Sequence, residues 1–406
     1  MSFAYDLLLK KTGSLKFESL SELESIKVMR NQVLNFLKFI LVTAKNEDDA
    51  YTIFETLNAR GLSLTSVDLI KNWIFKNYSQ IHPNDNAKDV WREIRKRISD
   101  FSDLETFFRH YWNSKYAFAS NDRLYKSFKL FLKAGIILSA RDFLLELKTA
   151  SEYYRKIGSP EDGDWTIQKE KVIGQSLVLI NQYKVTQVRP LLLALFECKP
   201  NINQTIFIKS IVNLENFHFL FSNLCQDRAS GLEGKYTRAA KNLRMAGDDK
   251  QKVRKVLVDL NKYLEKKRPN LQRVTDSLNK LDFKNGNDLN KKTIQTIFSK
   301  IEKSFYKTNE FAIGSFSLEH IKDQSESDLW IGSIGNIIPL DENINNMIKG
   351  GITFKDKKNK YSKSRFETVK YFLNLNHQDT WTEENAKKWV EELGRKLFAA
   401  TDIQKL

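Results

Sequence analysis

The chain has 406 residues, and 66 lysines and arginines against 50 aspartates and glutamates give it a formal net charge of +16. Because 41% of its residues are hydrophobic, large cores can be buried, and the length allows two or three domains of roughly 100–200 residues each. No apolar run approaches the roughly 20 residues of a membrane span, no hydrophobic signal segment follows Met1, and Cys198 and Cys225 lack zinc-ligand spacing. A cytoplasmic protein with no membrane partner and no structural zinc is predicted.

Helical periodicity dominates the chain as far as residue 306. Apolar residues recur every three or four positions in segments joined by short polar loops, and proline and glycine are scarce. Gly61 suits the left-handed end of one helix, and Thr65-x-x-Asp68 resembles a capping box that opens the next. The predicted helices cover residues 21–44, 48–57, 67–78, 85–99, 103–113, 122–132, 140–157, 169–182, 188–197, 204–224, 234–245, 248–266, 271–281 and 291–306.

The positive charge is concentrated in one helical segment. Residues 228–300 contain 19 Lys and Arg against 8 Asp and Glu, whereas residues 301–406 contain 16 of each. A concentrated basic segment provides the phosphate neutralisation on which non-specific DNA binding depends. The alternative is a solvated, lysine-rich helix face. We favour nucleic-acid contact, and the absence of an RNA-reading aromatic signature favours DNA over RNA.

The pattern changes after Tyr306. Residues 311–319 alternate like a strand, and residues 330–340 form a second apolar strand. A short helix from Asn343 is stopped by Gly350-Gly351, a lysine-rich stretch follows at 355–370, and a final helix is predicted at 383–401. The fold class predicted is therefore mainly α, with multi-helical N-terminal and middle regions and a small C-terminal α+β module.

His320 stands apart from the other four histidines because it follows Glu319 at the end of a predicted strand. A carboxylate and an imidazole there point to opposite faces, so one can hold a divalent metal while the other accepts a proton from water. Asn336 and Asn345 follow, and amide oxygens are hard ligands that suit magnesium. By composition alone, such a Glu-His pair is more often a surface pair without catalytic meaning.

A series of motifs in a fixed order surrounds this pair. It consists of Leu318-Glu319-His320-Ile321, then Ile334-Gly335-Asn336-Ile337-Ile338-Pro339-Leu340, then Asn345, then Phe354-x-x-Lys357-Lys358-x-x-Tyr361-x-x-Ser364. The series resembles the HNH module of the GmrSD-type modification-dependent restriction proteins. The resemblance implies a ββα-metal fold and a metal-dependent DNA endonuclease.

The same resemblance assigns roles to individual residues. His320 would be the general base, and Asn336 would brace the ββα-metal loop. Glu319 and Asn345 would be the ligands of Mg²⁺ or Mn²⁺. The lysines implied to contact DNA, or else to stabilise the module, are Lys355, Lys357, Lys358 and Lys360. The family commonly has proline three residues after the histidine, and Asp323 at that position leaves a degenerate nuclease open as the alternative.

A second series of motifs lies near the N-terminus. It consists of Glu47-Asp48-Asp49-Ala50, then Ile53-Phe54-Glu55-Thr56-Leu57-Asn58-Ala59-Arg60-Gly61-Leu62-Ser63-Leu64, then Asp68-Leu69-Ile70-Lys71-Asn72. This series resembles the C-terminal part of the ParB-like domain of the same proteins. The nucleotide-hydrolysing Asp-Gly-Gln-Gln-Arg motif of that domain does not occur in this sequence, and neither does a Walker-type loop. We therefore expect no nucleotide hydrolysis by this chain alone, and a ParB-like partner chain or self-association.

Asn58 and Arg60 are the only candidates for a contact with a nucleotide cofactor, and helix capping is the alternative that we favour for Asn58, Gly61 and Asp68.

The predicted domains are a helical remnant of the ParB-like domain at 1–115, a basic helical linker or DNA-binding domain at 116–300, and an HNH nuclease domain at 301–406. The predicted function is cutting or nicking of modified or phage DNA in restriction. The alternative is a non-catalytic DNA-binding or regulatory subunit that needs a partner chain for nucleotide hydrolysis.

Overall fold

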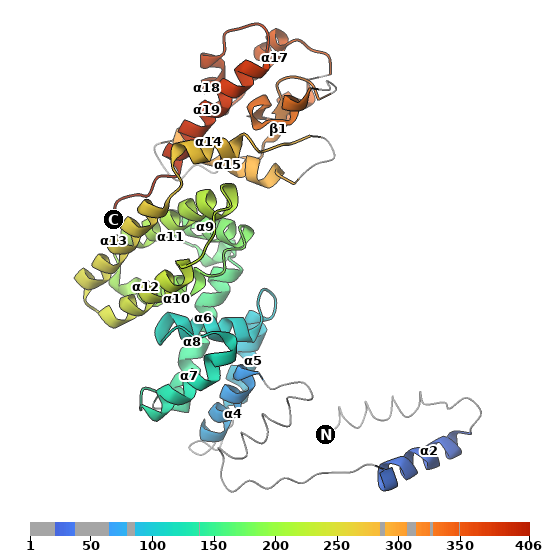
Figure 1. The fold of residues 1–406 in the computed structure, drawn as a ribbon, viewed down its shortest axis with the longest axis vertical. Helices are drawn as coiled ribbons and strands as arrows, with labels where there is room; N and C mark the ends of the chain where they lie inside the picture. Colours follow the sequence, from blue (N-terminus) through green and yellow to red (C-terminus); the bar gives the residue numbers. More distant parts are fainter. Residues whose placement is uncertain are drawn as a thin grey trace. The chain divides into compact units, whose positions relative to one another are not determined.

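The computed structural model describes residues 21–36, 65–78, 86–137, 139–284, 289–306, 314–324, 328–348 and 350–406. The chain divides into two units, Met1–Leu64 and Thr65–Leu406 (Figure 1). In the first unit the described part is helix α2 (Glu22–Asn31), followed by a π-helical turn (Gln32–Phe36). The predicted helix at 48–57 and the candidates Asn58 and Arg60 lie outside the described residues.

The second unit begins with a large helical core. Its first helix starts as predicted, because the Thr65 and Asp68 side chains cap each other's backbone amides at 3.2 Å, and the capping box is confirmed. Phenylalanine, tyrosine and tryptophan side chains on successive helices meet in its interior. The helices are α4 (Ser66–Tyr78), α5 (Asn86–Ile98), α6 (Leu104–Lys115), α7 (Asn121–Lys133), α8 (Ala140–Gly158), α9 (Lys171–Gln182), α10 (Arg189–Glu197), α11 (Gln204–His218), α12 (Leu232–Ala246) and α13 (Lys250–Lys267).

Shorter turns complete the large core. They are the 3-10 turns η2 (Asp162–Asp164), η3 (Gln168–Glu170) and η4 (Lys199–Asn201). The π-helical turn η5 (Phe219–Leu224) continues α11, and Phe219, Leu220 and Leu224 belong to a second core. None of the described helices combines the length and the apolar character that a bilayer crossing requires. The described chain is mainly α-helical, as predicted, and its one described sheet lies near the C-terminus.

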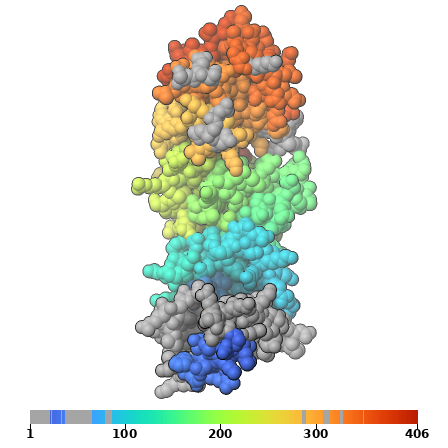
Figure 2. Space-filling model, turned by 90° about the vertical axis from the view of Figure 1, so that its right-hand side faces the viewer, coloured from blue at the N-terminus to red at the C-terminus, as the bar shows by residue number. Residues whose placement is uncertain are grey.

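A second core, which we call the C-terminal core, surrounds that sheet. Apolar side chains of two helices before the sheet and three after it form one cluster with those of its strands. Its elements are α14 (Leu271–Leu278), α15 (Lys291–Ser304), β1 (Ser317–His320), η6 (Leu329–Gly332), η7 (Ile334–Asn336), β2 (Ile337–Leu340), α16 (Glu342–Asn346), α17 (Phe354–Tyr361), α18 (Glu367–Leu375) and α19 (Glu383–Ala400). Figure 2 shows these residues in yellow, orange and red, next to the green helices of the large core.

The sheet is a two-stranded antiparallel pair in which Glu319 lies opposite Ile338 and His320 opposite Ile337. The second strand is shorter than predicted, because the 3-10 turns η6 and η7 replace its first half. Of the first predicted strand, residues 311–313 lie outside the described residues, and the described strand begins at Ser317. The close approach of η7 to α19 explains this difference. A Cβ atom on Gly335 would lie 2.4 Å from the carbonyl oxygen of Ala386, so only glycine fits there.

The predicted domain boundaries do not coincide with the limits of the cores. The boundary at 300 falls inside α15, whose buried residues Ile294, Ile297 and Phe298 belong to the C-terminal core. The boundary at 115 falls at the end of α6, which packs against α10 and α12 within the large core. The apolar stripe of α15 faces β2 and α19, and a helix with one such stripe must bury it against its neighbours.

The two cores of the second unit are joined by buried polar contacts and by the last residues of the chain. Lys300 on α15 donates to Glu215 on α11 at 2.6 Å, in a pair that is almost fully buried. After α19, Ile403 inserts into the large core. The side chain of Asn213 pairs with both backbone groups of Gln404, at 2.9 Å each. The chain thus returns from the C-terminal core to the large core.

Candidate active site

His320 ends β1 and is held by a backbone carbonyl from a distant part of the chain. Its Nε2 donates to the carbonyl oxygen of Phe283 at 2.8 Å, and the two rings stack with centroids 5.5 Å apart. A carbonyl can only accept a hydrogen bond, so Nε2 carries the proton and Nδ1 carries the lone pair. This contact orients Nδ1 as the basic nitrogen of the ring.

The Nδ1 atom of His320 accepts a hydrogen bond from the side-chain amide of Gln324 at 2.6 Å. The histidine is only 5% exposed, and burial lowers its pKa below the usual imidazole range. The carbonyl of Phe283 and the charge of Glu319 oppose that shift without cancelling it. The imidazole is therefore neutral at pH 7 and can accept a proton once water replaces the amide of Gln324 at Nδ1.

Asn336 is fully buried and spans the loop that follows His320. Its amide nitrogen donates to the carbonyls of Lys322 and Ile331, at 3.0 and 2.8 Å, and its amide oxygen accepts from the backbone nitrogen of Lys322 at 2.8 Å. Its own carbonyl accepts from Ile321. Three side-chain hydrogen bonds fix the loop against η6. Asn336 therefore holds the loop in place and takes no part in proton transfer.

Glu319 points away from His320, as expected of neighbouring strand residues. Its carboxylate accepts from Lys357 at 2.8 Å and from the hydroxyl of Tyr361 at 3.1 Å, and all three residues are buried. Lys357 also donates to the backbone carbonyl of His320 at 2.7 Å. The charge of Glu319 is therefore already neutralised by a lysine of α17.

This arrangement does not fit a preformed metal site. Among the described residues, no group of three or more His, Cys, Asp and Glu side chains could hold a metal ion. Asn345, the other predicted ligand, is half-buried on α16, which packs near β1, and its side chain makes no hydrogen bond to the described residues. The structure thus brings Glu319 next to Lys357 and not next to an open coordination point.

The four lysines predicted to contact DNA all have partners within the module. Lys357 is buried, and Lys358 donates to the carbonyl of His377 at 2.9 Å in the loop after α18. Lys360 donates to the carbonyl of Met347. Lys355 is the most exposed of them, with an ion pair to Asp379 at 3.1 Å. These contacts correspond to the stabilising role that the resemblance offered as an alternative to phosphate contact.

Asp323 stands where the family has proline, and it has a structural partner. Its carboxylate accepts from the backbone nitrogen of Gly351 at 3.3 Å, in the turn before α17. The φ angle of Gly351 is +78°, a conformation that side-chain-bearing residues rarely adopt. The loop after His320 is therefore tied to α17 by a hydrogen bond that proline could not make.

Phe283 and Gln324 are the two site residues that the sequence analysis did not identify. Phe283 lies between two predicted helices and outside the predicted nuclease domain, and its contribution is a backbone carbonyl, which no residue type reveals. A bridge between Asp282 and Ser333 holds it beside the sheet. The aromatic ring of Phe283 after a helix end was the one available signal.

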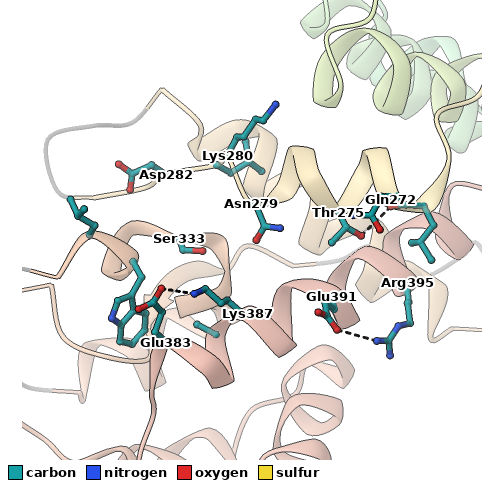
Figure 3. A pocket seen from close by; sticks show the side chains of 15 residues that line it. Gln272, Thr275, Asn279, Lys280, Asp282, Ser333, Glu383, Lys387, Glu391 and Arg395 are labelled. Carbon is teal, nitrogen blue, oxygen red and sulfur yellow. Dashed lines mark hydrogen bonds and ion pairs between the residues drawn. The ribbon is translucent and has the colours of Figure 1, made fainter.

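A groove of about 860 Å³ lies beside this support, between α14 and α19. Figure 3 shows Asp282 and Ser333 at one end and Thr275, Glu391 and Arg395 toward the other. The charged residues of α19 in the groove pair with one another, as Glu391 does with Arg395 at 3.5 Å. The groove reaches the segment that holds His320, but the residues that line it do not include His320.

The geometry defines a mainly helical protein in which a buried histidine ends a strand, an asparagine braces the following loop, and helices cover the sheet. Two family models match the chain. The N-terminal domain of the GmrSD restriction endonuclease matches residues 4–75, and the C-terminal domain of the GmrSD restriction endonucleases matches residues 268–396. The chain belongs to the GmrSD restriction endonuclease family, as the resemblance predicted. No curated protein matches it.

The C-terminal match begins at residue 268 and therefore includes α14, α15 and Phe283. These are the elements that the C-terminal core adds to the predicted domain at 301–406. The family match and the C-terminal core thus both include residues before position 301.

Proposed function

We propose that this protein is an HNH-type endonuclease that cuts or nicks DNA in restriction of phage, with His320 as the general base. The observation that carries the proposal is the neutral, buried imidazole whose Nε2 is fixed by the carbonyl of Phe283. Such a ring has one basic nitrogen in a defined direction, which is what activation of a water molecule requires. Membership of a restriction endonuclease family supports the choice of DNA phosphodiester as substrate.

In the proposed reaction a water molecule replaces the Gln324 amide and loses its proton to Nδ1 of His320. The oxygen of that water forms a bond to phosphorus, the bond from phosphorus to one ester oxygen breaks, and this oxygen leaves with a proton from solvent. His320 then releases its proton to solvent. Asn336 keeps the loop after His320 in place throughout, and the carbonyl of Phe283 stabilises the charged imidazolium.

A requirement for Mg²⁺ or Mn²⁺ stays a prediction from the family resemblance. When bound in an HNH site, such an ion stabilises charge on the phosphate and the leaving oxygen. Here Glu319 would first have to leave Lys357, so we assign no step to a metal. Chelation with EDTA, followed by return of each ion, tests the requirement directly.

A second candidate is a non-catalytic DNA-binding or regulatory subunit, which acts with a ParB-like partner chain or by self-association. Two observations favour it. Glu319 is engaged by Lys357 and Tyr361, and both ring nitrogens of His320 already have partners. A protein of this kind would bind DNA without cutting it.

Plasmid nicking by the full chain separates the two candidates. The wild type, His320→Ala and the matched control His377→Ala would be compared on modified and unmodified plasmid, with and without divalent ions. His377 is exposed in the loop after α18 and serves as the control. Nicking lost in His320→Ala and kept in His377→Ala is expected. Nicking that persists in His320→Ala refutes the assignment of the base, and a wild type that binds but never cuts favours the second candidate.

A further inference from the structure

Helices α12 and α13 pack against each other at the edge of the large core and carry a large excess of positive charge (Figure 1). In α13 alone there are seven Lys and Arg against two acidic residues. Each helix buries one apolar stripe, with Tyr236 and Leu243 in α12 and Val253, Leu257 and Leu264 in α13. The charged residues therefore occupy the sides that face away from the core.

Some of these cations are used within the protein. Arg244 pairs with Glu197, Lys252 pairs with Asp249 at 3.1 Å, Arg254 donates to the carbonyl of Leu406, and Lys235 lies over the ring of Tyr263. Seven others are exposed and, within the part of the chain that the structure describes, make no ion pair, side-chain hydrogen bond or ring contact. We call these seven the outer basic face: Arg238, Lys241, Lys250, Lys255, Lys262, Lys266 and Lys267.

Several exposed lysines of the C-terminal core, by contrast, pair with an acidic residue on their own helix, as Lys370 does with Glu367 and Lys388 does with Glu384, both at 2.7 Å. Cations without partners repel one another, and their summed positive potential attracts an external anion. On α12 and α13, seven such cations lie on two helices that pack against each other.

The spacing on α13 suits an extended polyanion. Lys255, Lys262 and Lys266 are seven and four residues apart, which places them on one side of the helix at intervals of about 10 and 6 Å at a rise of ~1.5 Å per residue. Duplex DNA presents one negative charge per ~1.7 Å of its axis, so a helix lying along it meets phosphates at each of these positions. Asp259 lies on the same side and opposes the attraction.

We propose that the outer basic face is a DNA-backbone binding surface, separate from the site of His320, which anchors duplex DNA for that site. This inference rests on the proposed function for the choice of DNA. Duplex is favoured over single strands because the exposed positions of α12 and α13 include no aromatic residue. Proteins that bind single strands combine basic grooves with such stacking platforms. Contacts with phosphates carry no sequence preference, so the surface positions DNA without reading it.

The test measures binding by fluorescence anisotropy, with a labelled DNA duplex and the full chain carrying His320→Ala so that the DNA stays intact. The surface variant is K255Q/K262Q/K266Q. The matched control is K148Q/K370Q/K388Q, which removes the same charge from lysines that are paired with glutamates. Loss of three phosphate contacts lowers the steepness of log affinity against log salt concentration by about 3. The ratio of the parent's affinity to that of the surface variant should therefore fall about 40-fold between 50 and 200 mM salt.

Removal of a negative charge from the same surface should strengthen DNA binding instead of weakening it. Asp259→Asn removes the one carboxylate among the three lysines and should tighten binding, a gain that an unfolded variant cannot show. Equal losses in the surface variant and the control, or no loss in either, would overturn the proposal. So would loss of binding to single-stranded RNA with unchanged binding to duplex DNA, since the partner would then be RNA. Because binding is measured without cleavage, a failure to nick refutes the proposed function and leaves this surface to be judged on its own.

Discussion

The buried ion pair of Lys357 and Glu319 allows a stringent test of the C-terminal core. Lys357→Met keeps an unbranched side chain of similar length but leaves the carboxylate of Glu319, itself only 8% exposed, without a cation. Removing one partner of a buried pair typically costs about 3–5 kcal/mol, because an uncompensated charge remains. The hydroxyl of Tyr361 still donates to the same oxygen and reduces the cost. We expect the free energy of unfolding to fall by about 3 kcal/mol.

Urea denaturation followed by circular dichroism measures this loss. Lys355→Met is the matched control, because Lys355 lies on the same helix in an exposed pair with Asp379, and such pairs contribute below about 1 kcal/mol. The double variant K357M/E319M leaves no charge behind and should recover most of the stability. If Lys357→Met costs no more than Lys355→Met, or if the double variant is as unstable as the single one, the ion pair is not the buried support described above.

Three further predictions concern other buried polar groups. Nicking by the wild type should fall on the acid side with a midpoint below pH ~6.5, the ordinary imidazole value, because burial lowers the pKa of His320; a midpoint above pH 7 would contradict this. Burial also lowers the pKa of His218 to about 3, so the unfolded chain binds one more proton below pH ~6.5. The contribution of His218 to the free energy of unfolding is fully present above that pH, and it declines by about 1.4 kcal/mol per pH unit as the pH falls toward 3. In urea melts at pH 6, 5 and 4, the free energy of unfolding of His218→Gln should therefore decline less steeply than that of the wild type. Asn336→Ala leaves three backbone groups of Lys322 and Ile331 without this partner, and should cost about 2–4 kcal/mol of unfolding free energy as well as nicking activity. Unchanged stability in the same melts would refute its bracing role.

The helices could be predicted from the sequence because each buries one apolar stripe, and a stripe repeats visibly along the chain. Predicted and observed ends agree within a few residues from α5 to α15 and for α19. Helices α17 and α18 were not predicted, because the region after residue 354 was interpreted only as a lysine-rich stretch. The strands were less predictable, since the path through η6 and η7 depends on how closely Gly335 approaches α19. That approach is a property of the packed core rather than of a local pattern.

The candidate site shows a similar limit. The spacing of the motifs singled out His320 and Asn336, and the structure places His320 at the end of β1 and the side chain of Asn336 against the loop that follows. The same spacing singled out Lys357 without revealing that it faces inward toward Glu319. Which way a lysine on a short helix points depends on a buried carboxylate from another element. The carbonyl of Phe283 was beyond sequence reasoning, because every residue has one.

The return of the chain to the large core after α19 has a consequence for how this unit opens. Leu397 is buried in the C-terminal core, and Ile403 is buried in the large core. The six peptide units that join them can span at most about 20 Å, so neither core can separate far while both side chains stay buried. Opening of one core therefore withdraws a buried side chain and several hydrogen bonds from the other. Amide hydrogens in α11 and α19 should then exchange through one shared opening event, with a common free energy, rather than as two independent folding units.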